Sequence, residues 1–412
     1  MKILQVCKKF PYPLKDGESL AIHNMAEGLV AGGVELHLFC INTKKHFFDP
    51  SKLPDTANPY ASITLVPLDT KVTLLGAFLN LFSGRSYHIQ RFWSPRVARA
   101  LEKLLEQEKF DVIQLEGIHL MPYKKRIEQF SDALLVLRAH NLEHQIWERI
   151  TANTKTGPKK WYLSYLTKKL KKFEEFAIRQ TSFLVPISSL DLGHFNSMGF
   201  RGQFCLCPIG IDPNKYLPET QAFRHFAVFS LGSMDWLPNL EGIDWFRKEV
   251  WPDFHRKFPD ATLHIAGRNM PESWLSDRDS GIEIHGEVPD AVSFMNKYPV
   301  MIVPLFSGSG MRAKIIEAMA LGRTVVTTTV GLEGIPGEDG RSVCLADSRE
   351  GFVRQLSDLA LDKAKMEAIG EAGRVLIFEQ FQSSAIAPKL LESYCLWLAK
   401  RREEQLTNTQ NG

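Results

Sequence analysis

Short hydrophobic runs alternate with amphipathic helical patterns along the first half of the chain. An apolar run at 3–6 is followed by a helical pattern at 20–29 and a second apolar run at 34–41. A strand, a helix and a strand in this order predict parallel strand pairing and an α/β fold. The same alternation predicts further elements at 63–66, 94–107, 111–115, 133–137 and 183–187.

The alternation starts again after a proline-bearing segment at 208–213. The predicted elements of this half are strands at 226–231, 261–266, 282–285, 300–305 and 324–328 and helices at 239–258, 289–296 and 312–321. Two successive α/β halves predict two doubly wound, Rossmann-like domains that face each other across a cleft. Ligands of such sheets bind at the carboxyl ends of the strands.

The domain boundaries follow from the same pattern. We expect a first domain over 1–207 and a second domain over 208–384. Residues 385–412 are expected to form a helix that packs back on the first domain and ends in a frayed polar tail.

Composition narrows the class of protein. Of the 412 residues, 44% are hydrophobic and 24% are charged, as in soluble globular proteins. Lys and Arg total 50 against 47 Asp and Glu, and the net charge of +3 is too small for a protein that binds bulk nucleic acid. The six cysteines are scattered, and no apolar run is long enough to span a bilayer. We therefore expect a protein of the reducing cytoplasm.

The most informative segment is a glycine-rich turn that joins a predicted strand to a predicted helix. Gly308 and Gly310 let the backbone approach a ligand closely, and the free N–H groups of the first helical turn favour an anion. Arg312 and Lys314 add two cations beside these groups. An ordinary turn with solvated basic residues is the alternative interpretation.

The same turn also fits the G-x-G-x-x-A dinucleotide fingerprint over 308–313, which would indicate an oxidoreductase. The strand that follows has no acid about 20 residues on to hold a ribose 2′-hydroxyl. This departure weakens the oxidoreductase interpretation but leaves it open.

Several motifs in the right order resemble the retaining glycosyltransferases of family 4, which have the GT-B fold. The donor-site signature of that family resembles residues 317–326 with Gly331 just after. The other matching segments are 10–11 with Gly17, 138–143, 187–188, 208–212 and 232–239. The resemblance covers nearly the whole chain, and it implies a first domain that holds the acceptor and a second that holds a nucleotide-sugar.

The resemblance also implies roles for particular residues. Glu317 would accept both ribose hydroxyls of the donor, because an ionised carboxylate offers two acceptor oxygens. His140 would lie near the donor sugar, and Gly17 would face the donor phosphates and the acceptor. The remaining donor-binding candidates are Gly232, Arg268, Ser309, Gly310, Met311, Arg312 and Lys314. Purely structural roles for Glu317, His140 and Gly17 stay open.

This sequence departs from the family pattern at three positions. The family carries two acids eight residues apart, and the position eight before Glu317 is Ser309. An arginine and a lysine usually neutralise the diphosphate, and their positions read Ser233 and Pro238. These departures keep a second interpretation open, a catalytically degenerate scaffold that binds sugar nucleotides.

A diphosphate leaving group still needs compensating charge, because electrostatic stabilisation is usually the largest catalytic contribution. We hypothesise that Arg312 and Lys314, together with the N-terminus of their helix, supply it from the other loop. Arg268 is a third candidate.

The chemistry implied by the resemblance is transfer of a glycosyl group with retention at the anomeric carbon. The donor would be a UDP- or GDP-sugar, and the acceptor a glycan or a lipid-linked sugar of a surface polysaccharide or glycolipid. The leaving diphosphate would receive the acceptor proton, so the carboxylate pair of a glycosidase is not required. The donor loop has no D-x-D motif, so neither a metal nor another cofactor is expected.

A basic amphipathic helix is predicted at 159–173, within a stretch that carries seven lysines from 155 to 172. Together with an apolar stretch at 72–82, it is typical of a membrane-surface element. One interpretation is a cytoplasmic protein that contacts the anionic inner face of a membrane. An ordinary packed helix with a solvated basic face is the alternative.

Overall fold

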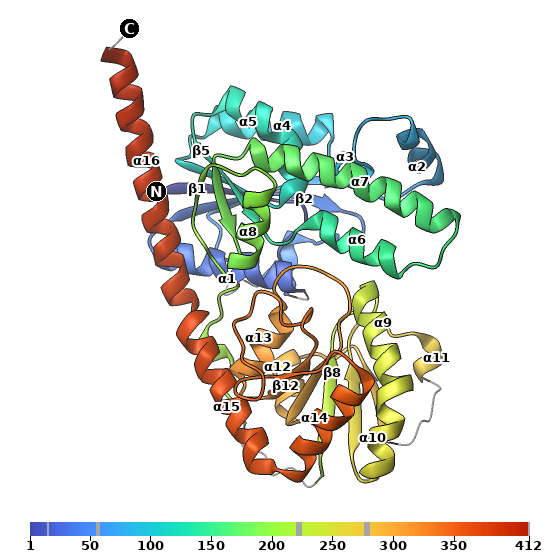
Figure 1. The fold of residues 1–412 in the computed structure, drawn as a ribbon. Coiled ribbons are helices and arrows are strands. Elements are labelled where there is room, and N and C mark those ends of the chain that lie inside the picture. The colour runs from blue at the N-terminus through green and yellow to red at the C-terminus, as the bar shows by residue number, and fades with distance from the viewer. Residues whose placement is uncertain (15, 55–57, 220–224, 276–280, 411–412) are drawn as a thin grey trace. The chain divides into compact units, whose positions relative to one another are not determined.

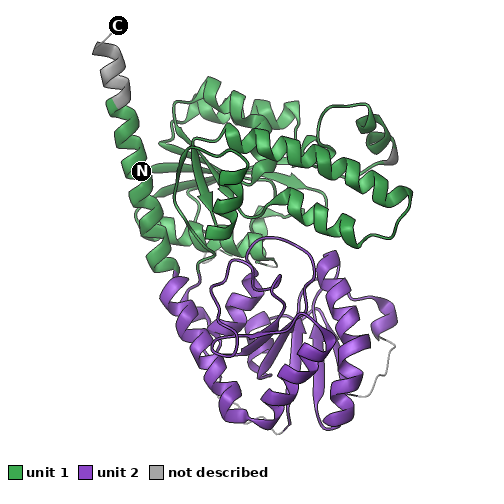
Figure 2. Ribbon diagram, viewed as in Figure 1, with its two compact units in different colours: residues 1–210, 383–412 green, residues 211–382 purple. Residues whose placement is uncertain are grey.

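The computed structural model describes residues 1–412 apart from 15, 55–57, 220–224, 276–280 and 411–412 (Figure 1). The side chains of 74, 275 and 404–410 are also outside the description. The chain forms two compact units (Figure 2), one of residues 1–210 with 383–412 and the other of residues 211–382. The chain therefore leaves the first unit after Gly210 and returns to it at Ser383.

The first unit is built on a seven-stranded parallel sheet with the strand order β3-β2-β1-β4-β5-β6-β7. Its strands are β1 (Lys2–Cys7), β2 (Glu35–Thr43), β3 (Ser62–Leu68), β4 (Val112–Glu116), β5 (Leu134–Ala139), β6 (Phe183–Pro186) and β7 (Gln203–Phe204). The central strand β4 is buried along its whole length, because helices cover both faces of a parallel sheet. The order reverses between β1 and β4, and ligands of doubly wound sheets bind at such a point.

Helices flank this sheet on both faces (Figure 1). They are α1 (Gly17–Ala31), α2 (Leu74–Leu81), α3 (Tyr87–Gln90), α4 (Pro95–Gln107), α5 (Lys124–Phe130), α6 (Glu143–Asn153), α7 (Pro158–Arg179), α8 (Ser189–Ser197) and α16 (Ser383–Gln410), with short 3₁₀ helices at Pro50–Lys52 and Ile118–Tyr123. Some begin at a side chain that caps the helix: Ser94, for example, caps α4 by accepting from the Arg96 N–H group at 3.2 Å.

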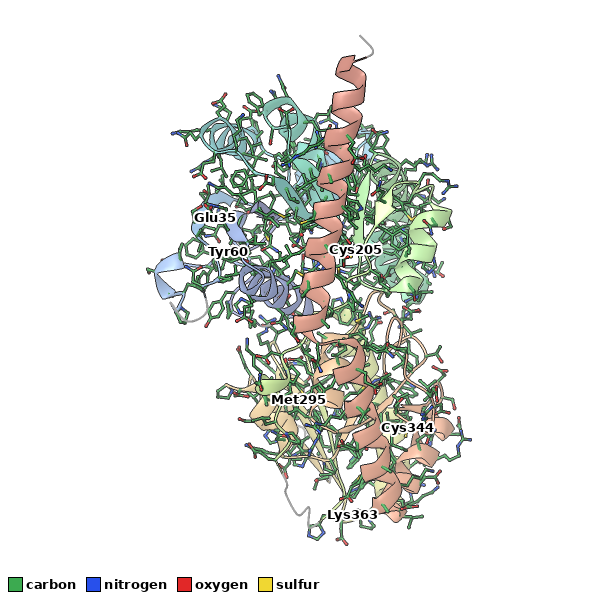
Figure 3. All side chains as sticks on the ribbon, turned by 90° about the vertical axis from the view of Figure 1, so that its left-hand side faces the viewer. Glu35, Tyr60, Cys205, Met295, Cys344 and Lys363 are labelled. Atoms are coloured by element: carbon green, nitrogen blue, oxygen red, sulfur yellow. The ribbon has the colours of Figure 1, made fainter. Side chains whose placement is uncertain are left out.

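The last helix, α16, packs on α1 and on the sheet of the first unit. A Cβ atom at Gly28 of α1 would lie 2.6 Å from Ala387 Cβ, so glycine is required where the two helices cross. Cys205 Sγ lies 3.8 Å from the Lys389 carbonyl oxygen, and Figure 3 labels Cys205 beside this helix. The polar end of the chain is helical to Gln410, and the last two residues lie outside the described part.

The second unit repeats the plan with six parallel strands in the order β10-β9-β8-β11-β12-β13. Its strands are β8 (Ala227–Leu231), β9 (Thr262–Ala266), β10 (Ile282–Gly286), β11 (Val300–Val303), β12 (Thr324–Thr327) and β13 (Cys344–Leu345). Its helices are α9 (Leu237–Trp245), α10 (Trp251–Lys257), α11 (Glu272–Leu275), α12 (Ala291–Asn296), α13 (Ala313–Ala320), α14 (Arg349–Leu361) and α15 (Lys363–Gln380), with a 3₁₀ helix at Pro213–Lys215. Here the order reverses between β8 and β11. The prediction of two doubly wound α/β sheets is confirmed.

One predicted element differs in kind from the structure. The single helix expected at 239–258 contains a π-helical segment at Phe246–Val250 between α9 and α10. Pro252 at the start of α10 has no N–H group to donate to the preceding turn, which explains why the regular pattern is interrupted there.

Candidate functional site

The loops after β8 and β9 touch each other in the second unit, and the loop after β11 lies beside the β8 loop. A Cβ atom at Gly267 would lie 1.7 Å from the Gly232 carbonyl oxygen, so the backbones that follow β9 and β8 are in direct contact. Gly267 has a φ of +145°, a conformation that favours glycine. The Gly232 N–H group donates to Ala266 O at 3.1 Å. The start of the loop at Gly232 is therefore held against the loop after β9 by backbone contacts.

Arg312 fixes the shape of the glycine-rich loop after β11. Its buried side chain donates from Nη1 to Ser309 O at 2.6 Å and to Gly310 O. Gly308 and Gly310 have φ angles of +107° and +81°, which let these carbonyl groups turn toward the guanidinium group. The Arg312 guanidinium carbon also lies 5.8 Å from the centre of the Trp236 ring. Arg312 thus donates to its own loop, a contact that sequence reasoning did not foresee.

Lys314, on the first turn of α13, reaches toward the loop after β8. Its Nζ donates to Asn239 Oδ1 at 2.8 Å, and Asn239 Nδ2 in turn donates to Ser233 O at 3.0 Å. A Cβ atom at Gly232 would lie 3.3 Å from Lys314 Nζ, so glycine leaves room for the ammonium group. Burial, and then the neighbouring Arg312, lower the pKa of Lys314 to about 7.

Glu317 lies one helical turn after Lys314, and residues three apart share a helix face. The Tyr216 hydroxyl donates to Glu317 Oε1 at 2.9 Å. Burial raises the pKa of Glu317 to about 7. Burial thus brings the pKa values of two groups on neighbouring turns of α13, Lys314 and Glu317, to about 7. Sequence reasoning missed Tyr216, because a lone tyrosine after the 208–213 segment carries no spacing signal.

The remaining donor-binding candidates lie in the same loops. Ser309, between Gly308 and Gly310, and Met311, which follows Gly310, are both buried. The Arg268 carbonyl oxygen accepts from the Met234 N–H group at 2.9 Å, which ties the loop after β9 to the loop after β8. Of the positions that depart from the family pattern, Ser233 donates its hydroxyl to Asp235, and Pro238 lies in the first turn of α9.

A second polar group lies in the first unit, where β4 and β5 end. His140, directly after β5, donates from Nε2 to Glu116 Oε2 at 2.6 Å. Glu116 also accepts through Oε1 from Gln5 Nε2 at 2.6 Å and from Gln114 Nε2 at 2.5 Å. This network holds the His140 ring in one orientation at the end of β5.

The carboxylate of this network is fully buried and charged. Burial by itself would raise the pKa of Glu116, but Arg138 and then His140 hold it below its usual value. Arg138 Nη1 lies 3.6 Å from Glu116 Oε2 and donates to Ala21 O at 3.1 Å. Sequence reasoning found His140 but missed Glu116, since one acid in an apolar strand pattern gives no hint of its partner.

Gly17 lies at the start of α1 in the same unit. Asp16 caps this helix by accepting from the Ser19 N–H group at 2.9 Å. Next to Gly17, Glu18 forms ion pairs with Lys8 at 3.2 Å and Lys9 at 3.3 Å. The N-terminus of α1 thus lies among partly buried charges of both signs.

Residues 225–362, which include the loops after β8 and β11 and the helix α13, match the family described as "Glycosyl transferases group 1". This part of the chain is similar to that group. The recognition of a GT-B glycosyltransferase from sequence motifs is confirmed at this level, and the match does not distinguish family 4 within the group.

A protein from Klebsiella pneumoniae, described as an uncharacterised 44.6 kDa protein in the cps region, is 24% identical over 169 residues. The aligned part is 39% of this chain and 43% of the relative. The chain therefore spans less than half the length of this relative.

Solved structures share the fold over nearly the whole chain. Sucrose-phosphate synthase from Thermosynechococcus elongatus has a TM-score of 0.72 at 14% identity, over 97% of this chain and 100% of its own. HepE of Anabaena in complex with UDP-glucose has a TM-score of 0.66 at 13% identity, over 95% and 99%. The pneumococcal O-GlcNAc transferase GtfA, with UDP and GlcNAc, has a TM-score of 0.64 at 13% identity, over 96% and 98%. At these identities the likeness establishes the GT-B fold.

Proposed function

We propose that this chain is a retaining glycosyltransferase that moves a sugar from a nucleotide-sugar to a glycan or lipid-linked acceptor. The observation that carries the proposal is the arrangement on α13, where Glu317 and Lys314 share one face beside the loops after β8 and β11. Ligands of doubly wound sheets bind at this edge. HepE, TarM and GtfA structures with UDP favour UDP over GDP as the nucleotide.

Each part of the donor has a matching group in the second unit. Glu317 accepts the two ribose hydroxyls, and Tyr216 keeps its carboxylate oriented. Lys314 donates to the diphosphate, with the N–H groups at the start of α13 beside it. Arg312 contributes through the shape of the loop that it holds, and its charge lies next to the same phosphates. Gly232 leaves room for the Lys314 ammonium group beside the phosphates.

The transfer requires little covalent chemistry from the protein. The bond between the anomeric carbon and the diphosphate oxygen breaks, and the acceptor oxygen forms its bond to that carbon on the same face. The acceptor proton passes to the departing diphosphate. His140 and Gly17 belong to the first unit, which contributes to the sugar and acceptor side of the reaction.

The test of this function is a donor screen with the full chain. We expect one UDP-sugar to bind and to be hydrolysed slowly without an acceptor, and we expect mass spectrometry to detect a glycosylated lipid-linked acceptor. Glu338→Ala serves as a control, because Glu338 pairs with Arg341 on the surface of the second unit. Binding without any turnover would favour the scaffold alternative, and binding of NAD(P) instead would favour the oxidoreductase.

We place the acceptor in the assembly of a surface polysaccharide or glycolipid. The relative in the cps region of Klebsiella pneumoniae supports this setting.

No helix of the described part of the chain is long and apolar enough to cross a membrane.

Contact with an anionic membrane surface is part of the proposal, and two neighbouring helices support it. Phe78 and Leu79 on α2 and Phe82 directly after it are exposed, Phe82 by 80%. The basic helix α7 is joined to this segment, since Tyr165 Oη donates to Leu81 O at 2.6 Å and Lys169 Nζ to Asn80 O at 2.6 Å. Exposed aromatic rings beside lysines are the pattern of an interfacial element.

Replacing Phe78 and Phe82 together by serine is expected to remove most binding to anionic vesicles. The change removes apolar area that would enter the lipid and leaves the lysines of α7 in place. Flotation with phosphatidylglycerol vesicles at low and high salt measures it. Leu361→Ser is the matched control, because Leu361 is 77% exposed in the other unit. If the unchanged chain does not float at low salt, the membrane contact is wrong.

A further inference from the structure

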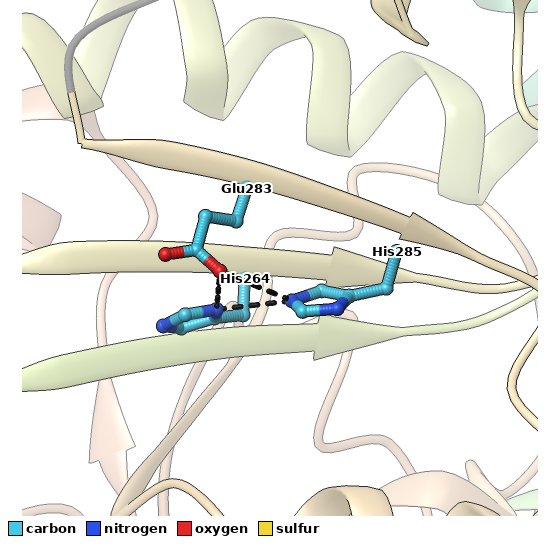
Figure 4. A group of neighbouring side chains, drawn as sticks. All are labelled: His264, Glu283 and His285. Carbon is cyan, nitrogen blue, oxygen red and sulfur yellow. Dashed lines mark hydrogen bonds and ion pairs between the residues drawn. The ribbon is translucent and has the colours of Figure 1, made fainter.

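Three potential metal ligands converge on one face of the sheet in the second unit, away from the α13 group. His264 lies on β9, and Glu283 and His285 lie on β10. The register pairs Glu283 with His264, and His285 is two residues on, so all three side chains point to the same face. Figure 4 shows them directed toward one another from the two strands. Among the described residues, this is the group of His, Cys, Asp or Glu side chains that could hold a metal ion.

The distances between the three donor atoms suit a small divalent cation. His264 Nδ1 lies 3.0 Å from His285 Nε2 and 3.3 Å from Glu283 Oε2, and His285 Nε2 lies 3.8 Å from Glu283 Oε2. An ion about 2.1 Å from each ligand, in tetrahedral or octahedral geometry, needs about 3.0–3.4 Å between ligand atoms. Two of the three separations fall in this range, and the third closes by a small rotation of Glu283, which is 58% exposed.

A neighbouring residue orients the buried histidine for this role. His264 Nε2 lies 2.9 Å from Thr262 Oγ1 on the same strand, and its ring stacks on Tyr298 with 4.0 Å between ring centres. When Nε2–H donates to the Thr262 hydroxyl, Nδ1 presents its lone pair to the other two ligands. A second hydrogen bond of this kind is the usual feature that fixes a metal-binding imidazole.

We propose that His264, Glu283 and His285 bind a divalent first-row transition metal ion, of which Zn²⁺ is the best match, and that this ion clamps β10 onto β9. Two imidazoles and one carboxylate are a ligand set that Zn²⁺ accepts, with a remaining position open to water. The strand β10 needs a clamp, because it is the edge strand of its sheet and its pairing is irregular between Ile284 and Gly286. This site is independent of the proposed transfer reaction, and the expected absence of a metal in the donor loop is unaffected.

The test is zinc binding by the full chain after removal of metal ions with a chelator. Calorimetry with ZnCl₂ is expected to give one equivalent, and Zn²⁺ is expected to raise the unfolding midpoint by a few degrees through ligand linkage. His285→Gln and Glu283→Gln are expected to weaken binding by more than about tenfold, since each removes a ligand. Thr262→Val, which keeps the ligands, is expected to weaken it by about tenfold. His225→Gln, at an exposed histidine of the same unit, is the control and leaves binding unchanged.

Cobalt distinguishes this site from the thiol pair in the first unit, where Cys205 Sγ and Cys207 Sγ lie 3.6 Å apart. A Co²⁺ complex of the proposed site shows visible d–d bands without a thiolate charge-transfer band. The proposal is overturned if no Zn²⁺ binds, or if binding survives His285→Gln and is abolished by Cys205→Ser.

Discussion

Replacing Glu317 by alanine is expected to weaken binding of UDP-glucose by at least about a hundredfold. The change would remove the two charge-assisted hydrogen bonds that the carboxylate accepts from the ribose hydroxyls, each worth about 1.5–3 kcal/mol. Calorimetry or competition with a labelled nucleotide measures the affinity. If another UDP-sugar proves to be the donor, the same loss applies, because the contact is to the ribose.

Two variants show whether the loss is specific. Tyr216→Phe removes only the hydroxyl that donates to Glu317 Oε1, so a loss of a few fold is expected. Glu338→Ala removes an exposed carboxylate of the same unit and should leave affinity unchanged. An affinity that is unchanged in Glu317→Ala, in a chain that still unfolds cooperatively, would remove Glu317 from the donor site.

The affinity for UDP-glucose should also pass through a maximum near pH 7. The Glu317 carboxyl, with its pKa raised to about 7, loses its acceptor-only form as the pH falls. Lys314, with its pKa lowered to about 7, loses its charge as the pH rises. The fraction of molecules with both Glu317 and Lys314 charged falls by about threefold at pH 6 and at pH 8 relative to pH 7, and the affinity should follow it. Glu317→Gln should lose the acidic limb, and Lys314→Met the alkaline limb.

The sequence predicted the fold well because the signals for parallel α/β units are local. Apolar runs alternate with amphipathic helices along the chain, and each glycine-rich turn follows a strand. The π-helical segment at Phe246–Val250 was not predictable in this way, because apolar periodicity continues through it and only Pro252 marks the break.

The sequence predicted those candidate site residues that lie within a linear motif. It did not predict those that only the folded chain brings together. Glu317, Lys314 and His140 lie within linear motifs. Tyr216 meets Glu317 across 101 positions, and Gln5 meets Glu116 across 111, so only the folded chain brings these pairs together. Arg312 differs in another way, since its charge is visible in the sequence but its bonds to its own loop carbonyls are not.

His140→Ala is expected to lower the turnover number by about 100-fold or more while UDP binding changes little. A polar group preorganised at a reacting centre contributes about that much, and the hydrogen bond from His140 Nε2 to the buried Glu116 provides the preorganisation. The measurement is the rate of sugar transfer, or of slow donor hydrolysis, at saturating UDP-sugar, together with the affinity for UDP.

The chain offers a closely matched control for this variant. His144 Nδ1 pairs with Glu174 at 2.6 Å, as His140 pairs with Glu116, and both pairs have side-chain exposures of 6% and 0%. His144→Ala should therefore destabilise the fold by a similar amount, because each variant leaves a buried carboxylate without its imidazole. Equal losses of stability with a loss of turnover only in His140→Ala would assign His140 to the reaction. Equal losses of turnover in both variants would reduce His140 to a structural residue, because removing a buried histidine would then be sufficient to explain the defect.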